Sequence, residues 1–136
     1  MRAVLDPNVI ISAVLAPAGT PAKLLRGWLD GVYELVVSPR LLDELERAFG
    51  YSKIRARVTR DDAEELVELL RADGDLCDDP PDPPAIRSSD PGDDYLISLA
   101  EAAGAVIVSG DRHLLDLQGR LPVYSPAAFL ELLAGE

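Results

Sequence analysis

The chain alternates short runs of consecutive apolar residues with longer segments in which apolar residues recur every three or four positions. The short runs are typical of strands buried on both faces of a sheet, and the longer segments are typical of amphipathic helices. This pattern predicts strands at residues 3–6, 33–38, 76–77, 105–109 and 121–124. It predicts helices at residues 8–16, 20–31, 39–50, 59–74, 92–104, 111–117 and 125–136.

Residues at the ends of these segments support several of the helix boundaries. Ser38 and Ser125 each stand directly before a helix whose first residue is proline, which is a strong start signal. Thr20 is expected to cap the second helix and Gly31 to end it, and Gly50 is expected to end the third.

The order of the elements predicts the fold class. Strands separated by helices pair in parallel through right-handed crossovers, which places helices on both faces of the sheet. We therefore expect a three-layer α/β/α sandwich around a central, mostly parallel sheet. A length of 136 residues with 48% apolar content suits a single domain over residues 1–136. The proline-rich segment 78–92 is expected to be a surface loop, since too little chain follows it to build a second core.

Composition excludes several kinds of site. The single cysteine, Cys77, excludes an intrachain disulfide and a cysteine-based zinc cluster, and the single histidine, His113, excludes a site built from several histidines. Asp6 and Pro7 interrupt the first apolar run, unlike a signal peptide, and no stretch of about 18 apolar residues occurs. We therefore expect a cytoplasmic protein that does not associate with a membrane.

The charge is strongly acidic overall but unevenly distributed. A net charge of −11 argues against a protein that simply coats nucleic acid, because an acidic surface repels phosphate. Six of the 13 basic residues nevertheless fall between positions 40 and 60: Arg40, Arg47, Lys53, Arg55, Arg57 and Arg60. This basic region is either a solvated helix face or a binding surface.

Acidic residues stand where the predicted strands end. Asp6 directly follows the first strand, and Asp111 follows the strand at 105–109 after one glycine. Glu44 lies about one and a half turns into the helix after the second strand, and Asp93 opens the helix after the proline-rich segment. Parallel strands share one carboxyl edge, where open α/β sheets bind ligands, so we expect these four carboxylates to converge.

Converging carboxylates imply a cation. Four close acids raise one another's pKa values unless a cation is bound, and oxygen ligands alone suit Mg²⁺ or Mn²⁺. Such an ion polarises a phosphate and activates water, so the expected substrate is a phosphodiester. Each acid also has a structural interpretation. Asp6 and Asp111 suit helix N-caps, Asp93 or Asp94 suits a first-turn acid, and Glu44 suits a solvated helix face.

Three blocks of the chain resemble, in order and spacing, those of PIN-domain proteins: VLDPNVIISAVL, VVSPRLLDELERAF and DPGDDYLISLAEAAGAVIVSGDRHLLDL. They are most similar to the toxin-like PIN group of prokaryotic toxin–antitoxin systems, and the resemblance extends from Arg2 to about Ala134. It implies an α/β/α nuclease with Mg²⁺- or Mn²⁺-dependent endoribonuclease activity, in which water attacks RNA to leave a 5′-phosphate and a 3′-hydroxyl. It also implies a protein antitoxin as partner and a homodimer.

The resemblance assigns roles to individual residues. The family's acids fall on Asp6, Glu44, Asp93 and Asp111, with Asp94 as the alternative to Asp93. Asp6, Asp93 and Asp111 would bind the metal, and Glu44 would complete the ligands of a second metal or orient the attacking water. Asn8 and Ser109 would position these carboxylates through hydrogen bonds. Related proteins often have a further acid where this chain has His113.

Residues outside the acidic set have two interpretations each. The basic residues that would steer an RNA backbone toward the acids are Lys53, Arg55, Arg57 and Arg60. Trp28 with Leu24, Leu25 and Leu29 predicts a buried helix face, and the alternative is a base-stacking platform or part of an antitoxin groove. His113 is expected to be a bystander, and the alternative is a proton donor or a phosphate contact.

Other functions fit the sequence less well. Receiver-type phosphotransfer domains need a lysine near the last strands, and no lysine follows Lys53. Haloacid-dehalogenase-type enzymes need an aspartate two residues after the nucleophile, where this chain has Asn8. The main alternative is a catalytically silent PIN-like module that binds RNA or a protein, and a structural subunit kept for its dimer surface is a further one.

Overall fold

A five-stranded sheet forms the centre of the computed structural model, which describes residues 1–135. The strands are β1 (Arg2–Leu5), β2 (Glu34–Val37), β3 (Asp75–Leu76), β4 (Val106–Val108) and β5 (Val123–Tyr124). They are ordered β3-β2-β1-β4-β5, and every neighbouring pair is parallel. The predicted parallel α/β fold is therefore confirmed.

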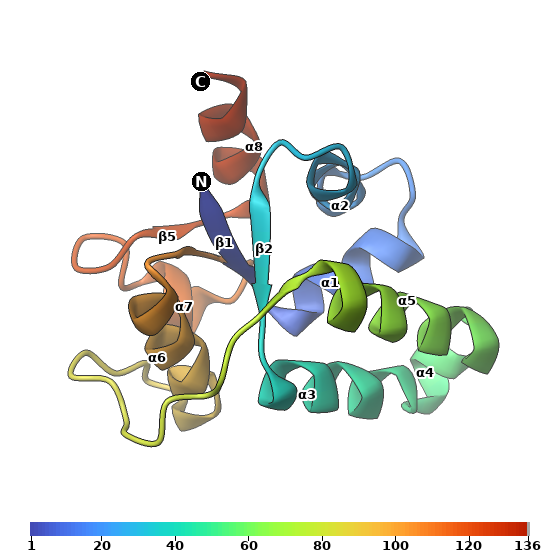
Figure 1. The fold of residues 1–136 in the computed structure, drawn as a ribbon, viewed down its shortest axis with the longest axis horizontal. Helices are drawn as coiled ribbons and strands as arrows, with labels where there is room; N and C mark the ends of the chain where they lie inside the picture. The colour runs from blue at the N-terminus through green and yellow to red at the C-terminus, as the bar shows by residue number, and fades with distance from the viewer. Residues whose placement is uncertain (136) are drawn as a thin grey trace.

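Eight helices connect and cover these strands. They are α1 (Pro7–Leu15), α2 (Thr20–Leu29), α3 (Pro39–Phe49), α4 (Ser52–Arg55), α5 (Arg60–Asp73), α6 (Asp94–Ala103), α7 (Arg112–Leu115) and α8 (Pro126–Ala134) within the described residues. A single 3₁₀ turn, Pro91–Asp93, precedes α6. In Figure 1, α1, α2, α3 and α5 lie on one side of the central strands, and α6 and α7 lie on the other.

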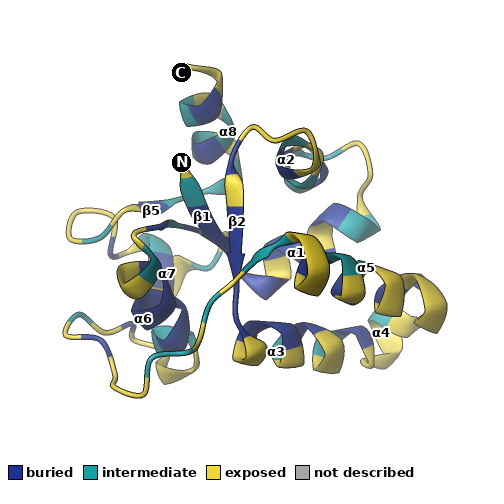
Figure 2. Cartoon of the chain, in the orientation of Figure 1, coloured by how far each residue is buried: buried dark blue, intermediate teal, exposed yellow. Residues whose placement is uncertain are grey.

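Burial explains why the first strand lies at the middle of the sheet. Ala3, Val4 and Leu5 are fully buried, and β1 pairs with both β2 and β4, with Ala3 opposite Leu35 and Leu5 opposite Val108. A strand that is apolar on both faces needs helices above and below it. Figure 2 shows the buried residues gathered on the strands and the exposed ones on the outer sides of the helices.

The structure corrects several predicted details. The N-cap of α2 is Gly19, so the prediction that Thr20 caps this helix is wrong, because Thr20 already belongs to its first turn. Trp28 is buried as predicted, but Leu29 is 54% exposed and does not belong to the buried face. The edge strand lies one residue earlier than predicted, and helix α4 falls in a segment for which no helix was predicted.

Other local predictions agree with the structure. The hydroxyl of Ser38 accepts a hydrogen bond from the amide of Leu41 at 3.2 Å, and that of Ser125 accepts one from Ala128 at 3.1 Å. The predicted end of the last helix at residue 136 lies outside the described residues. Within residues 1–135, no single helix has the length and apolar character to cross a membrane. The pair Pro7–Leu15 and Thr20–Leu29 meets that criterion together by length and composition, with a bend of 101° between the two helices.

Candidate active site

Asp6 occupies the turn between β1 and α1, at the carboxyl edge of the sheet. Its side chain is only 5% exposed. One carboxylate oxygen accepts a hydrogen bond from the amide of Asn8 at 3.0 Å, so Asp6 caps α1, and the other accepts one from the hydroxyl of Ser109 at 2.8 Å. Burial raises the pKa of Asp6, and these two hydrogen bonds act in the opposite direction because they favour the charged form.

Ser109 connects Asp6 to a second acid. It directly follows β4 and is completely buried. While its hydroxyl donates to Asp6, its oxygen accepts a hydrogen bond from the amide of Asp111 at 2.9 Å. Asp111 in turn caps α7, because its carboxylate accepts a hydrogen bond from the amide of His113 at 2.9 Å. The ends of β1 and β4 are thus linked through one hydroxyl group.

Asp93 lies near the same acids and belongs to the 3₁₀ turn before α6. One carboxylate oxygen each of Asp90, Asp93 and Asp111 lies within 4.8 Å of those of the other two. The pKa of Asp93 is raised to about 7, first by burial and then by the negative charge of Asp111, with smaller contributions from Asp6 and Asp90. Three acids from two segments, the turn at residues 90–93 and the start of α7, therefore share a small volume, and their negative charges repel one another.

The two alternatives for the third acid lie in different surroundings. Asp94 accepts a hydrogen bond from the amide of Ser88 at 2.9 Å and so holds the preceding loop, while Asp93 lies among the acids. Asp90 was not among the predicted site residues. Its carboxylate accepts a hydrogen bond from the amide of Gly92 at 3.0 Å. The sequence Ser-Asp-Pro-Gly predicts such a turn, but not that the turn lies beside Asp111.

Glu44 lines a pocket of about 270 Å³ together with Asp6 and Asp93. The lining residues of this pocket are Asp6, Pro7, Asn8, Glu44, Arg47, Ala48, Tyr51, Asp93 and Leu96. Glu44 accepts a hydrogen bond at 2.9 Å from the hydroxyl of Tyr95 on α6, and its other oxygen lies 3.9 Å from the guanidinium of Arg40. Asp111 lines a neighbouring pocket, with which this one shares Asn8.

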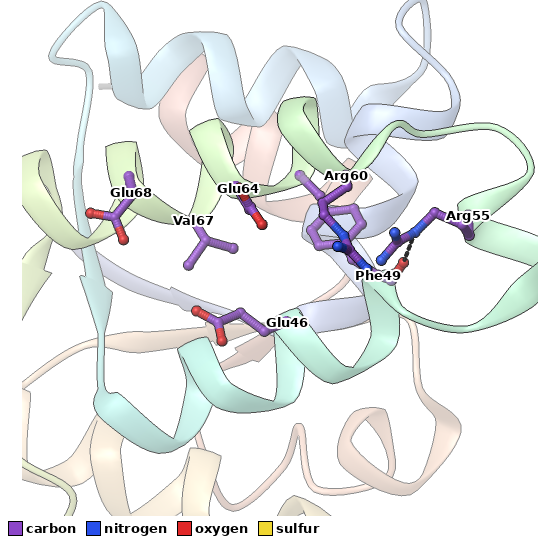
Figure 3. Close-up of a pocket in the computed structure, with 8 residues that line it drawn as sticks. Glu46, Phe49, Arg55, Arg60, Glu64, Val67 and Glu68 are labelled. Atoms are coloured by element: carbon purple, nitrogen blue, oxygen red, sulfur yellow. Dashed lines mark hydrogen bonds between the residues drawn. The ribbon is translucent and has the colours of Figure 1, made fainter.

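The predicted basic residues lie elsewhere. Figure 3 shows Arg55 and Arg60 in a separate pocket of about 250 Å³ between α3, α4 and α5, among the acids Glu46, Glu64 and Glu68. This pocket shares no lining residue with the one that contains Glu44. Lys53 and Arg57 are exposed, and the guanidinium of Arg57 donates to the carbonyl of Leu15 at 2.9 Å. The structure does not bring these four residues to the acids.

Arg47 is the basic residue that lines the pocket containing Asp6, Glu44 and Asp93, and it was not among the predicted site residues. His113 is exposed, and its Nδ1 lies 2.6 Å from the hydroxyl of Ser89 in the proline-rich segment. This contact connects α7 to the loop that carries Asp90. It explains how a loop far away in the sequence is held beside Asp111.

The donors at this edge fit a hard divalent cation. They are carboxylate oxygens from Asp6, Asp93 and Asp111, with Asp90 and Glu44 nearby. Within residues 1–135, no lysine, arginine or histidine forms an ion pair with Asp6, Asp93 or Asp111. These three carboxylates thus have no ion-pair partner in the described part of the chain, and Mg²⁺ and Mn²⁺ are the ions that such oxygen donors prefer.

Comparisons with known proteins give a family and a fold. A family model described as a PIN domain matches residues 2–113. One similar solved chain comes from the crystal structure of VapBC2 from Rickettsia felis bound to a DNA fragment from their promoter. It has a TM-score of 0.62 and 14% identity, and the match covers 92% of this chain and 98% of that one. Another is PAE2754 from Pyrobaculum aerophilum, with a TM-score of 0.65 and 17% identity over 99% of this chain and 90% of that one. No curated protein matches the chain.

Proposed function

This chain belongs to the PIN domain family, and on that premise we propose that it is a metal-dependent endoribonuclease. The observation that carries the proposal is the group of acids at the carboxyl edge of the sheet. Asp93 and Asp111 lie together, Asp6 is joined to Asp111 through Ser109, and no cationic side chain among residues 1–135 pairs with these three. A catalytically silent module would have no need to keep such repulsive charges together.

The acids divide into metal ligands and a residue that positions water. Asp6, Asp93 and Asp111 would hold Mg²⁺ or Mn²⁺. When bound, the ion supplies polarisation of the scissile phosphate and a lowered pKa for a bound water. Glu44 is held in place by the hydroxyl of Tyr95, and it would accept a hydrogen bond from the attacking water at its carboxylate. The reaction would leave a 5′-phosphate and a 3′-hydroxyl.

Ser109 and Asn8 act on the ionisation and the orientation of the Asp6 carboxylate. Ser109 donates to Asp6 and so favours its ionised form, which is the form that binds a metal. Asn8 supplies the amide that orients the other oxygen of Asp6. Without a bound cation, burial and the negative charge of Asp111 raise the pKa of Asp93 to about 7 and so favour its protonated form.

We also propose a cellular role as the toxin of a toxin–antitoxin pair. The support is the similarity in fold to a chain of a VapBC2 structure, together with the family membership. The partners would be an RNA substrate, a protein antitoxin and a second copy of the chain, in the cytoplasm. Expression of the chain alone should then arrest growth, and Asp6→Asn should relieve the arrest.

The nuclease proposal is tested by cleavage of a labelled single-stranded RNA in Mn²⁺ or Mg²⁺ and in a chelator. Asp6→Asn should abolish cleavage. Asp43→Asn is the matched control, because Asp43 is an exposed acid of α3 that lines neither of the two pockets at the acids, and its replacement removes the same charge. Cleavage that persists in Asp6→Asn or in the chelator would contradict the proposal.

A further inference from the structure

Tyr51 is an exposed aromatic residue beside the acids. Its side chain is 59% exposed, more than any other large apolar side chain among residues 1–135. It lines the same pocket as Asp6, Glu44 and Asp93. The other exposed large apolar residues, which are Met1, Leu29, Val32 and Leu76, do not line that pocket. The position of Tyr51 therefore relates to the site and not to the core.

The backbone holds Tyr51 firmly although its ring is exposed. Its amide donates to the carbonyl of Ala48 at 3.1 Å, and its carbonyl accepts hydrogen bonds from Ile54 at 3.0 Å and Arg55 at 2.8 Å. Tyr51 is thus the N-cap of α4, fixed between the end of α3 and the start of α4. A ring on a fixed backbone loses little conformational entropy when a flat ligand stacks on it.

Arg47 supplies a positive charge in the pocket that the acids and this ring share. It lies in the last turn of α3, three residues after Glu44, and lines the same pocket. Arg47 is exposed and forms no ion pair among residues 1–135. A free guanidinium binds phosphate oxygens well, whereas a carboxylate repels them. The pocket thus combines acids for a cation, a guanidinium for a phosphate and an aromatic ring for a base.

We propose that Tyr51 stacks on an unpaired nucleobase next to the phosphate that enters the acidic pocket. Arg47 binds the phosphate of the nucleotide that carries this stacked base. This inference rests on the proposed function, since it takes RNA as the substrate. An exposed ring stacks on any base whose face is free, whereas the bases within a duplex already stack on both sides. The site therefore selects single-stranded RNA, with little preference for base identity.

Binding experiments test this subsite separately from cleavage. The parent protein carries Asp6→Asn, so that binding to a short labelled single-stranded RNA is measured by fluorescence anisotropy in Mg²⁺ without turnover. Adding Tyr51→Ala should weaken binding about tenfold, as expected for the loss of one stacked base. Tyr51→Phe should keep the parent's affinity, because it keeps the ring. Leu76→Ala, which shortens an apolar side chain that is 49% exposed and does not line the pocket, should also keep it.

A second binding experiment changes the RNA and removes its bases. An RNA of the same length without bases should bind the parent about tenfold more weakly, and Tyr51→Ala should not distinguish it from the RNA with bases. Equal affinity of the parent and Tyr51→Ala would overturn the inference. A change in oligomeric state with unchanged RNA binding would also overturn it, since Tyr51 would then belong to a protein interface.

The two proposals fail in different ways. If the unmodified protein cleaves RNA in Mn²⁺ and Tyr51→Ala changes neither binding nor cleavage, the nuclease proposal stands and the stacking inference fails. If Tyr51→Ala weakens RNA binding but the unmodified protein does not cleave, the stacking inference stands and the nuclease proposal fails. A thermal melt of each variant confirms that the fold is intact, because an exposed ring contributes little to stability.

Discussion

Ser109→Ala removes one buried hydroxyl that serves two of the proposed metal ligands at once. The hydroxyl oxygen lies 2.8 Å from a carboxylate oxygen of Asp6, to which it donates, and 2.9 Å from the amide nitrogen of Asp111, from which it accepts. The side chain is completely buried, so bulk water does not replace the lost contacts. The change therefore leaves the buried carboxylate of Asp6 and the amide of the half-buried Asp111 each with one partner fewer.

The size of the effect follows from the charges of the two partners. A hydrogen bond to a charged group contributes about 1.5–3 kcal/mol to stability, and a neutral one about 0.5–1.5 kcal/mol. Asp6 keeps its hydrogen bond from Asn8, so we expect Ser109→Ala to lower the free energy of unfolding by about 2–3 kcal/mol. For a domain of this length, the loss corresponds to a fall in Tm of about 10 °C. The pKa of Asp6 rises further, because the lost hydrogen bond had favoured its charged form.

Urea unfolding at neutral pH, with and without Mn²⁺, measures this prediction. Ser98→Ala is the matched control, because Ser98 is also buried and donates to the carbonyl of Asp82 at 3.2 Å, which is a neutral acceptor. The control should lose about 1 kcal/mol and keep its stabilisation by Mn²⁺. Ser109→Ala should lose more and bind Mn²⁺ at least about tenfold more weakly. Equal losses in both variants, or an unchanged response to Mn²⁺, would refute the reasoning.

Three further predictions concern the metal, the acids and the core. Mn²⁺ should raise stability by about 2.7 kcal/mol at a hundred times its Kd, and a Tm that does not respond to millimolar Mn²⁺ would contradict the site. Without metal, the free energy of unfolding should fall as pH rises from about 4 through 7. The cause is that folded Asp93, with its pKa raised to about 7, keeps a proton that the unfolded chain releases. Urea unfolding of Asp93→Asn should lack this part of the pH dependence. Tyr33→Phe should cost about 1 kcal/mol in chemical denaturation, since the buried hydroxyl of Tyr33 donates to the carbonyl of Leu24 at 2.8 Å.

The sequence predicts those elements whose signals are local or strongly apolar. β1, β2 and β4 are runs that only a sheet covered on both faces can bury, and the caps Ser38 and Ser125 act within their own helices. Short or marginal elements give weaker signals. Helix α4 has four residues and β3 has two, so each is too short to show a helical or strand period in the sequence. Leu29 continues the apolar period of α2 in sequence, but it is 54% exposed in the structure.

The location of the acids is predictable because the topology of a parallel sheet brings strand ends together. The hydrogen bonds to these acids are not predictable, because they join segments far apart in the chain: Ser109 with Asp6, and Tyr95 with Glu44. Asp90 joins the acids because the contact between Ser89 and His113 holds its loop beside α7. Closeness in sequence is also a poor guide to which basic residues lie at the acids. Arg55 and Arg60 line a separate pocket between α3, α4 and α5, whereas Arg47 lines the pocket with Asp6, Glu44 and Asp93.

Capping and metal binding are compatible functions for the same carboxylate. Asp6 uses one oxygen to cap α1 and the other to bind the hydroxyl of Ser109, while Asp111 caps α7 with one oxygen. A carboxylate has about four lone-pair positions, so each acid retains acceptor capacity after these hydrogen bonds. The cap restricts the side-chain rotamer, and a carboxylate oxygen of Asp111 lies within 4.8 Å of one of Asp93. A helix that starts directly after a strand thus orients a ligand at the edge of the sheet, and the repulsion among these acids is what a bound cation would relieve.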